Sequence, residues 1–240
     1  MTDLLIVIII FAAYVVEGLT GFGGAIIALP FLSLVLGLNN SVTLILMVSS
    51  FFGFYILLKK RGDVDWKQYA RMIGFMAIGL PIGVLMGRYL PQDILKLALG
   101  AFTLFAGVRG LWLKGGAKML SAFVMRLCLV GGGVLQGAFA TGGPLVIVYA
   151  KAMIPEKDRF RATLICVWLT LNITLLAVRW QTNQFGSVGG VIGFALVAWA
   201  AGILVGSHIC RKVNAAQFEK IVYWILFCSG VFMILQATVL

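Results

Sequence analysis

Apolar runs alternate with short polar stretches along the whole sequence, and most runs approach the ~20 residues that cross a bilayer as one helix. Two runs are longer, at residues 4–36 and 119–149, and a cluster of glycines interrupts each of them. The other runs predict single helices over residues 41–58, 72–88, 94–113, 162–178, 188–207 and 217–238. The pattern therefore predicts an all-α integral membrane protein with eight apolar segments.

The two glycine clusters read Gly18-Leu-Thr-Gly-Phe-Gly-Gly24 and Gly137-Ala-Phe-Ala-Thr-Gly-Gly143. Glycine disfavours the helix and frees the backbone to turn, so each cluster predicts a helix break at membrane depth. Such a break is tolerated where it is buried in protein or lines a wet cavity, and in transporters it aims half-helix N-termini at a bound anion. We expect the two copies to be halves of one substrate site. The alternative is that these glycines only permit tight helix packing.

Composition and charge exclude several classes of protein. The chain is 62% hydrophobic and 11% charged, with a mean hydropathy of +1.06, which lies outside the range of soluble globular proteins. The net charge of +11 comes from Lys and Arg between the apolar segments, as membrane orientation requires, so we expect no nucleic-acid partner. The four cysteines show no CxxC spacing, and no cleavable leader is expected before residues 4–16.

The two halves of the chain are related by an offset of 119 residues. This offset superimposes five separated places, which are Glu17-Gly18 on Gln136-Gly137, Gly23-Gly24 on Gly142-Gly143, Lys60 on Arg179, Gly83 on Gly202, and Gly87 on Gly206. We therefore predict two repeats, residues 1–115 and 116–240, that together form one transporter domain.

Two topologies compete for these segments. Eight ordinary spans would place ten basic residues on one side and nine on the other, which gives no orientation signal. If each Gly-rich segment is instead a re-entrant hairpin of two short half-helices, sixteen of the 19 basic residues share one side. The positive-inside bias favours the hairpins. A re-entrant hairpin does not cross the membrane, so each half crosses it three times, and the second half starts on the opposite side from the first. The predicted fold is therefore two inverted repeats, each with a broken, re-entrant helical hairpin and three transmembrane helices.

The candidate site residues follow from the two clusters. Glu17 is a carboxylate deep in an apolar stretch and is a candidate for coupling to protons or for ordering the hairpin tip, with Gln136 as its neutral counterpart. A half-helix N-terminus with a Thr hydroxyl makes an anion cradle. The predicted substrate-binding residues are Thr20, Gly21, Phe22, Gly23, Gly24, Thr141, Gly142, Gly143, Pro144 and Asn172. For Asn172, interhelical hydrogen bonding is the alternative.

Other polar residues are weaker candidates. Arg88 and Arg161 lie at span ends, where a guanidinium attracts oxyanions or simply anchors the helix at the interface. His208 lies beside a basic loop, and we expect neither a catalytic residue, a metal nor a cofactor.

The Gly-rich segments "GLTGFGGAIIALP" and "GAFATGGPLVIVY" resemble those of the sulfite exporter TauE/SafE family, also called the toluene sulfonate uptake permease family. The resemblance implies transport of sulfite or organosulfonates across the inner membrane by a multi-pass protein. Because Pro30 follows the first cluster at a distance and Pro144 follows the second directly, the two tips are not expected to be identical.

Our first hypothesis is thus a secondary transporter of a small anion that works by alternating access. The rivals are an anion channel, a membrane-embedded enzyme and a structural membrane subunit. The expected partners are the small anionic substrate and the lipid bilayer, and a homodimer is left open.

Overall fold

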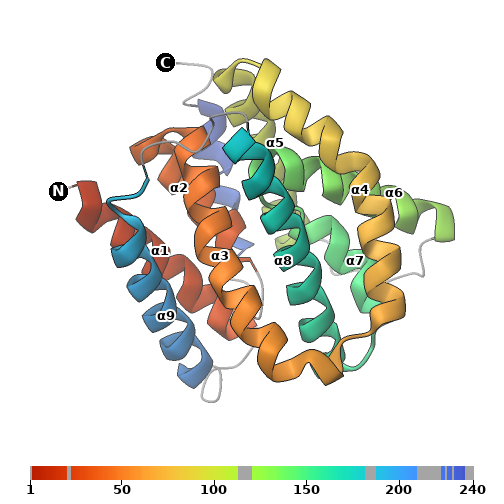
Figure 1. Ribbon diagram of the computed structural model, residues 1–240. Coiled ribbons are helices and arrows are strands. Elements are labelled where there is room, and N and C mark those ends of the chain that lie inside the picture. The colour runs from red at the N-terminus through yellow and green to blue at the C-terminus, as the bar shows by residue number, and fades with distance from the viewer. Residues whose placement is uncertain are drawn as a thin grey trace. The chain divides into compact units, whose positions relative to one another are not determined.

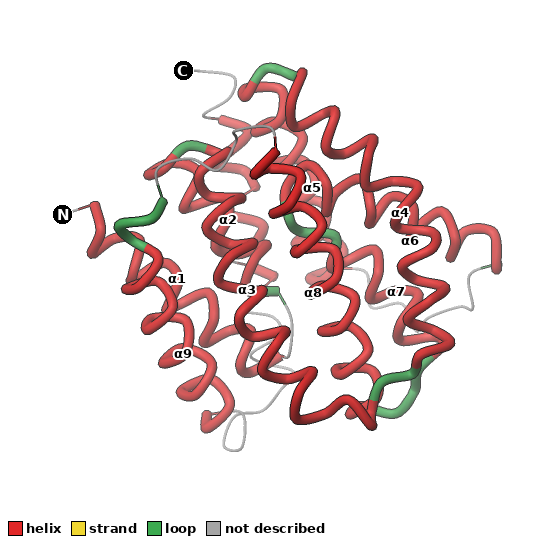
Figure 2. Tube along the Cα trace, viewed as in Figure 1, coloured by secondary structure: helices red, strands yellow, loops and turns green. Residues whose placement is uncertain are grey.

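The computed structural model describes residues 2–20, 23–112, 121–181, 188–209, 223–224, 226–228 and 230–235. Helices make up nearly all of this part of the chain, and no strand occurs in it (Figures 1 and 2). The predicted all-α class is confirmed.

The chain divides into two compact units, and each takes segments from both predicted repeats. One unit comprises residues 1–44, 90–115 and 186–240, and the other comprises residues 45–89 and 116–185. The first unit contains α1 (Thr2–Thr20), α2 (Gly24–Leu36), the start of α3 (Leu38–Lys60), α5 (Gln92–Trp112) and α9 (Ile192–Ile209). The second contains the rest of α3, the 3-10 turn Arg61–Asp63, α4 (Trp66–Tyr89), α6 (Ala122–Phe139), α7 (Gly143–Met153) and α8 (Lys157–Gln181).

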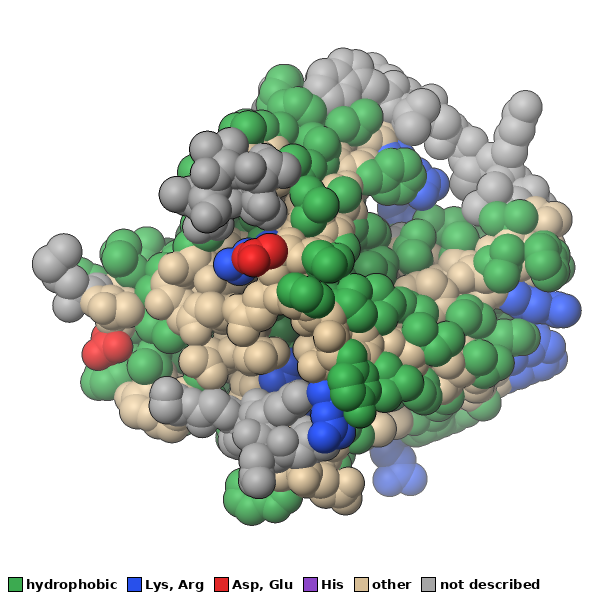
Figure 3. All heavy atoms as spheres, turned by 90° about the horizontal axis from the view of Figure 1, so that it is seen from above, with side chains coloured by type: hydrophobic (Ala, Val, Ile, Leu, Met, Phe, Trp, Pro, Cys, Tyr) green, Lys and Arg blue, Asp and Glu red, His purple; other side chains and the backbone are tan. Residues whose placement is uncertain are grey.

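Four of the described helices are long and apolar enough to cross a membrane, namely α4, α5, α6 and α8. Large hydrophobic side chains are exposed on them; Ile78 on α4 is 59% exposed and Phe105 on α5 is 55% exposed. In the space-filling view, hydrophobic side chains cover much of the visible face (Figure 3). Such exposure suits a surface solvated by lipid tails. Which side each segment faces, and hence the inverted topology, stays a prediction.

Glycines bring α4 and α6 into backbone contact in the second unit, where the two helices lie side by side (Figure 1). A Cβ added to Gly79 would meet the carbonyl oxygen of Val130, and one added to Gly83 would lie 2.9 Å from the backbone nitrogen of Ala138. Only glycine permits so close an approach. The glycines of α4, spaced four residues apart, therefore permit close helix packing at these two positions.

The first unit repeats this packing between α1 and α9, which also lie side by side (Figure 1). A Cβ on Gly202 would lie 2.7 Å from the Phe11 carbonyl oxygen, and one on Gly206 would meet the Val15 carbonyl. Residues 11 and 15 of α1 correspond to residues 130 and 134 of α6 at the predicted offset of 119.

The contacts of α4 and α9 correct the sequence alignment of the two predicted repeats. Gly202 makes the contacts of Gly79, and Gly206 makes those of Gly83, so α4 and α9 correspond with an offset of 123 instead of 119. The pairing of Gly83 with Gly202 was therefore wrong by one helical turn. A ladder of glycines at four-residue spacing looks the same after a four-residue shift, so the sequence could not distinguish the two registers.

The helix bounds also change the expected hairpins. In each Gly-rich segment the first arm is long, 19 residues in α1 and 18 in α6, and the second is short, 13 residues in α2 and 11 in α7. The expectation of two short half-helices was wrong for the first arms. At 1.5 Å per residue α7 is only ~17 Å long, well below the ~30 Å of the hydrocarbon core.

Candidate functional site

The second Gly-rich segment breaks at residues 140–142, between α6 and α7. Ala140 adopts the left-handed conformation with φ 53°, and its N–H donates to the carbonyl oxygen of Gln136 at 2.9 Å. A non-glycine residue rarely takes this conformation, so the surrounding packing must hold it. The chain then folds back and α7 packs against α6. This is shown by Gly132 on α6, where an added Cβ would touch the side chain of Val146 on α7. The irregular backbone predicted at this glycine cluster is confirmed.

Gln136 ties the two sides of this break together and is 2% exposed. Its Oε1 accepts the backbone N–H of Gly142 at 3.0 Å, and its Nε2 donates to Oδ1 of Asn172 on α8 at 2.8 Å. A backbone N–H can only donate, which fixes Oε1 toward Gly142 and Nε2 toward Asn172. The Asn172 amide must then present its oxygen to Gln136. Its NH₂ group, with two donors, is left for another acceptor.

Thr141 places a hydroxyl beside the start of α7. The residue is 4% exposed, and no hydrogen bond within the described part of the chain reaches its hydroxyl. No side chain caps α7 at its N-cap residue Gly142, and Pro144 occupies the first turn, where its missing N–H removes no helix bond. The positive end of the helix dipole and the uncapped N–H groups of the first turn make this an electropositive corner without a cationic side chain.

The first Gly-rich segment makes a related contact in the other unit. Oε2 of Glu17 on α1 accepts the backbone N–H of Gly24, the first residue of α2, at 3.0 Å. Gly23 before it has φ 99°, a conformation that favours glycine. Among the other predicted residues here, Thr20 ends α1, its side chain is not described, and Gly21 and Phe22 lie outside the described residues.

The two breaks are thus similar but not identical, as the different proline positions led us to expect. Gln136 binds the N–H of the N-cap residue Gly142, whereas Glu17 binds the N–H of Gly24, one position further into its helix. Pro30 lies inside α2, whereas Pro144 lies in the first turn of α7. One break is held by a neutral amide and the other by a carboxyl group.

Comparison with known proteins decides the family of the chain. Residues 5–233 match the family described as Sulfite exporter TauE/SafE. This chain belongs to the TauE/SafE family. It is also similar to the probable inner membrane transporter protein TsaS of Comamonas testosteroni, at 25% identity over 179 residues that cover 70% of this chain and 74% of that protein. No solved structure matches the chain.

The match confirms the resemblance inferred from the two glycine clusters. The TauE/SafE chain is a membrane transporter, and its apolar helices together with the inner-membrane relative indicate a multi-pass protein of the inner membrane. Family and relative are both transporters, which argues against an enzyme.

Hydrogen bonds between α4 and its neighbours α7 and α8 also support the second break of this TauE/SafE protein, and the sequence did not single out Gln68, Tyr69 or Tyr149. The Tyr149 hydroxyl on α7 donates to Oε1 of Gln68 at 2.9 Å, and the Tyr69 hydroxyl lies 2.8 Å from that of Thr170 on α8. Tyrosine and glutamine near a charged loop resemble ordinary interfacial residues, so only their pairing in space identifies them.

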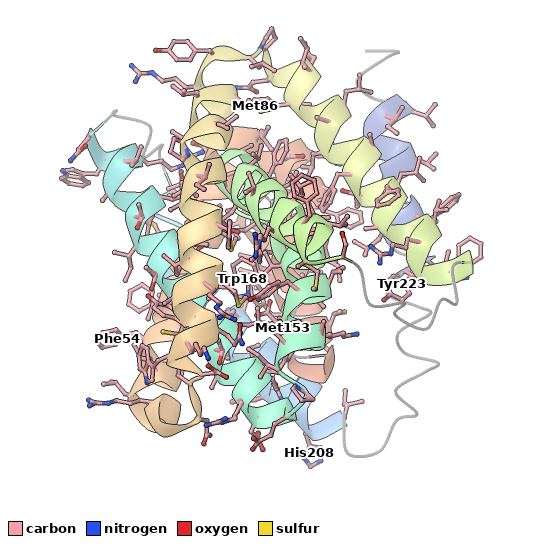
Figure 4. All side chains as sticks on the ribbon, turned by 90° about the vertical axis from the view of Figure 1, so that its right-hand side faces the viewer. Phe54, Met86, Met153, Trp168, His208 and Tyr223 are labelled. Atoms are coloured by element: carbon pink, nitrogen blue, oxygen red, sulfur yellow. The ribbon has the colours of Figure 1, made fainter. Side chains whose placement is uncertain are left out.

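The remaining candidates lie at helix ends or on the surface. His208 lies in the last turn of α9, at the lower end of the view in Figure 4, and its side chain is exposed. Arg88 and Arg161 are exposed as well. Within the described ranges no three His, Cys, Asp or Glu side chains gather in a way that could hold a metal ion.

Proposed function

We propose that this chain is a secondary transporter, without enzymatic activity, that moves a small oxyanion by alternating access. Sulfite or a chemically related organosulfonate is the proposed substrate, because the description of the family names a sulfite exporter. The anion binds at the second break, between the start of α7 and Asn172.

The observation that carries this proposal is the orientation of the two amides. The Gly142 N–H fixes Gln136, and Gln136 in turn leaves the Asn172 NH₂ group as a pure donor. The Thr141 hydroxyl and the uncapped first turn of α7 add further donors. A ligand that only accepts hydrogen bonds suits this arrangement, and a deprotonated sulfonate or sulfite oxygen is such a ligand.

Neutral donors also suit transport better than a fixed cation at the same place would. A carrier must release its substrate on the far side, and binding that is too strong slows release. Donors from amides, a hydroxyl and a helix N-terminus stabilise an anion without forming an ion pair. The shared internal packing of the two units supports the predicted repeats, and inverted repeats are the usual architecture of alternating access.

We further propose that Glu17 couples transport to protons. Its carboxyl group holds the first N–H of α2, and protonation would weaken that bond by replacing an anionic acceptor with a neutral one. Gln136 holds the other break without a titratable group.

Uptake of a panel of labelled anions into proteoliposomes tests the proposal. We expect saturable, trans-stimulated uptake of sulfite or a sulfonate, and a rise in KM of about tenfold, equal to about 1.4 kcal/mol, in both Thr141→Val and Asn172→Leu. Thr103→Val is the matched control, because the Thr103 hydroxyl bonds only within its own helix, to the Leu99 carbonyl oxygen at 2.6 Å. Flux that neither saturates nor responds to trans substrate indicates a channel. Wild-type kinetics in both site variants contradict the assigned site.

A further inference from the structure

Arg179 is a buried cation in the same helix as Asn172. It is 7% exposed and lies in the last turn of α8, inside the candidate membrane span Asp158–Gln181. Every other Lys or Arg side chain whose burial the structure describes is exposed or partly exposed. By sequence, Arg179 belonged to the polar turn after a predicted span ending at residue 178. The structure instead makes it the last buried residue of the helix.

Arg179 continues the buried face of α8 on which Asn172 lies. Asn172, Leu175 and Arg179 are all buried, whereas Ile173 and Trp180 are 52% and 69% exposed. Seven residues are two helical turns, so the two polar residues share one face with Cα atoms ~10.5 Å apart along the axis. Between them the face is apolar.

The guanidinium of Arg179 brings a positive charge into the span, and the proposed substrate is an anion whose oxygens only accept hydrogen bonds. Basic residues inside membrane segments are rare, and where they occur they commonly mark ion and substrate pathways. Arg179 already has a partner within the protein. Its guanidinium carries five N–H donors in a planar fork, a geometry that fits two oxygens of one oxyanion.

We infer that Arg179 forms a second, cationic binding position for the transported oxyanion, two turns along α8 from the Asn172 amide. This inference rests on the proposed function. The charge at Arg179 captures the anion near the end of the span and raises its concentration along this face of α8. The neutral donors at Asn172 and Thr141 then bind it during the transport step. Separating charge from the neutral site lets capture be strong while release from the site stays fast.

The first experiment is transport kinetics of Arg179→Gln in proteoliposomes, with labelled sulfite and a labelled sulfonate. We expect KM to rise about tenfold, equal to about 1.4 kcal/mol, with kcat changed less than about twofold. The wild-type KM should also increase with ionic strength, and this dependence should be weaker in the variant, because screening acts on the charge. Arg179→Lys should recover part of the loss, since lysine keeps the charge but not the fork.

The matched control is Arg109→Gln. Arg109 also lies in the last turn of a candidate span, on α5, but its side chain is exposed. It should keep wild-type KM and its salt dependence. Wild-type KM in a folded Arg179→Gln protein overturns the inference.

A second measurement uses the wild-type chain and does not depend on a folded variant. Phenylglyoxal modification of the reconstituted protein is read at Arg179 and Arg109 by peptide mass spectrometry. Sulfite should slow modification of Arg179 and leave that of Arg109 unchanged. Equal modification with and without sulfite overturns the inference. Complete inertness of Arg179 does so too, because it places the residue off any aqueous path.

Comparing the KM of the Arg179 variant with the KM of the Thr141 and Asn172 variants separates this inference from the proposed function. A raised KM in Asn172→Leu with wild-type KM in Arg179→Gln removes only the second binding position. Wild-type kinetics in both Thr141→Val and Asn172→Leu remove the proposed site, and with it the basis for Arg179.

Discussion

Glu17 accepts the backbone N–H of Gly24 at 3.0 Å and so holds the start of α2 against the end of α1. Gln136 plays the corresponding part for Gly142 at the same distance. A carboxyl group at one break and an amide at the other thus each accept a backbone N–H at the start of the following helix. The two differ in that only the carboxyl group changes its charge with pH. Replacing it by an amide therefore keeps the contact that holds the helix start and removes the group that could couple transport to protons.

The first prediction concerns Glu17→Gln. Glutamine keeps an oxygen for the Gly24 N–H, as Gln136 does for Gly142, so the variant should fold and insert normally. If Glu17 couples uptake to protons, the pH dependence of uptake should flatten. The measurement is initial uptake rate across a pH series, with Asp93→Asn, an exposed carboxylate 3.5 Å from Lys96, as the control. An unchanged pH profile in Glu17→Gln rules out coupling through this residue.

The second prediction concerns Gln136→Glu. The new carboxylate still accepts the Gly142 N–H but cannot donate to Asn172, so the Asn172 amide must turn and use its NH₂ group on the carboxylate. The anion site loses the donors that Asn172 presents to it and gains a negative charge. We expect KM to rise at least about tenfold, or about 1.4 kcal/mol.

The same substitution at Gln68 is the control for this experiment. Its Oε1 accepts the Tyr149 hydroxyl, and a glutamate oxygen can do the same. KM in Gln68→Glu should stay near that of the wild type. If Gln136→Glu also transports with wild-type KM, the amide orientation does not matter to binding.

The third prediction separates two adjacent glycines. A Cβ at Gly142 would meet the Gly132 carbonyl and lie 3.3 Å from Cβ of Gln136, whereas a Cβ at Gly143 meets nothing within 4 Å. Gly142→Ala should therefore lower uptake at least about tenfold by displacing the Gln136 contact, and Gly143→Ala should change it less than about twofold. Leucine at either position should abolish uptake while the protein stays inserted. Wild-type uptake by both leucine variants would refute the assignment of this tip.

The fourth prediction concerns the stability of the α4 and α6 pair. Gly83→Ala places a methyl group against the backbone of α6 and should lower the free energy of unfolding by about 1–3 kcal/mol. Gly74→Ala lies in the same helix with nothing within 4 Å of the new Cβ and should be neutral or raise it by about 0.5–1 kcal/mol. Unfolding of both variants in a denaturing detergent titration, followed by circular dichroism, compares them. Equal stability of the two would show that α4 and α6 do not pack closely through Gly83.

The sequence by itself determined the all-α membrane class, the two helix breaks and the TauE/SafE family. These properties depend on hydropathy, on glycine clusters and on spacing, which are local along the chain. It also singled out Glu17, Gln136 and Asn172, since polar residues in apolar runs stand out before any contact is known.

Only the tertiary structure decided which groups meet. It paired Gln136 with both Gly142 and Asn172, residues 6 and 36 positions away, and thereby set the direction of two amides. It shifted the α9 register by one turn, because a glycine ladder with four-residue spacing leaves that register undetermined in one dimension. It also placed Arg179 on the buried face of α8, which depends on where the helix ends and on what packs beside it, and neither is encoded in the local pattern.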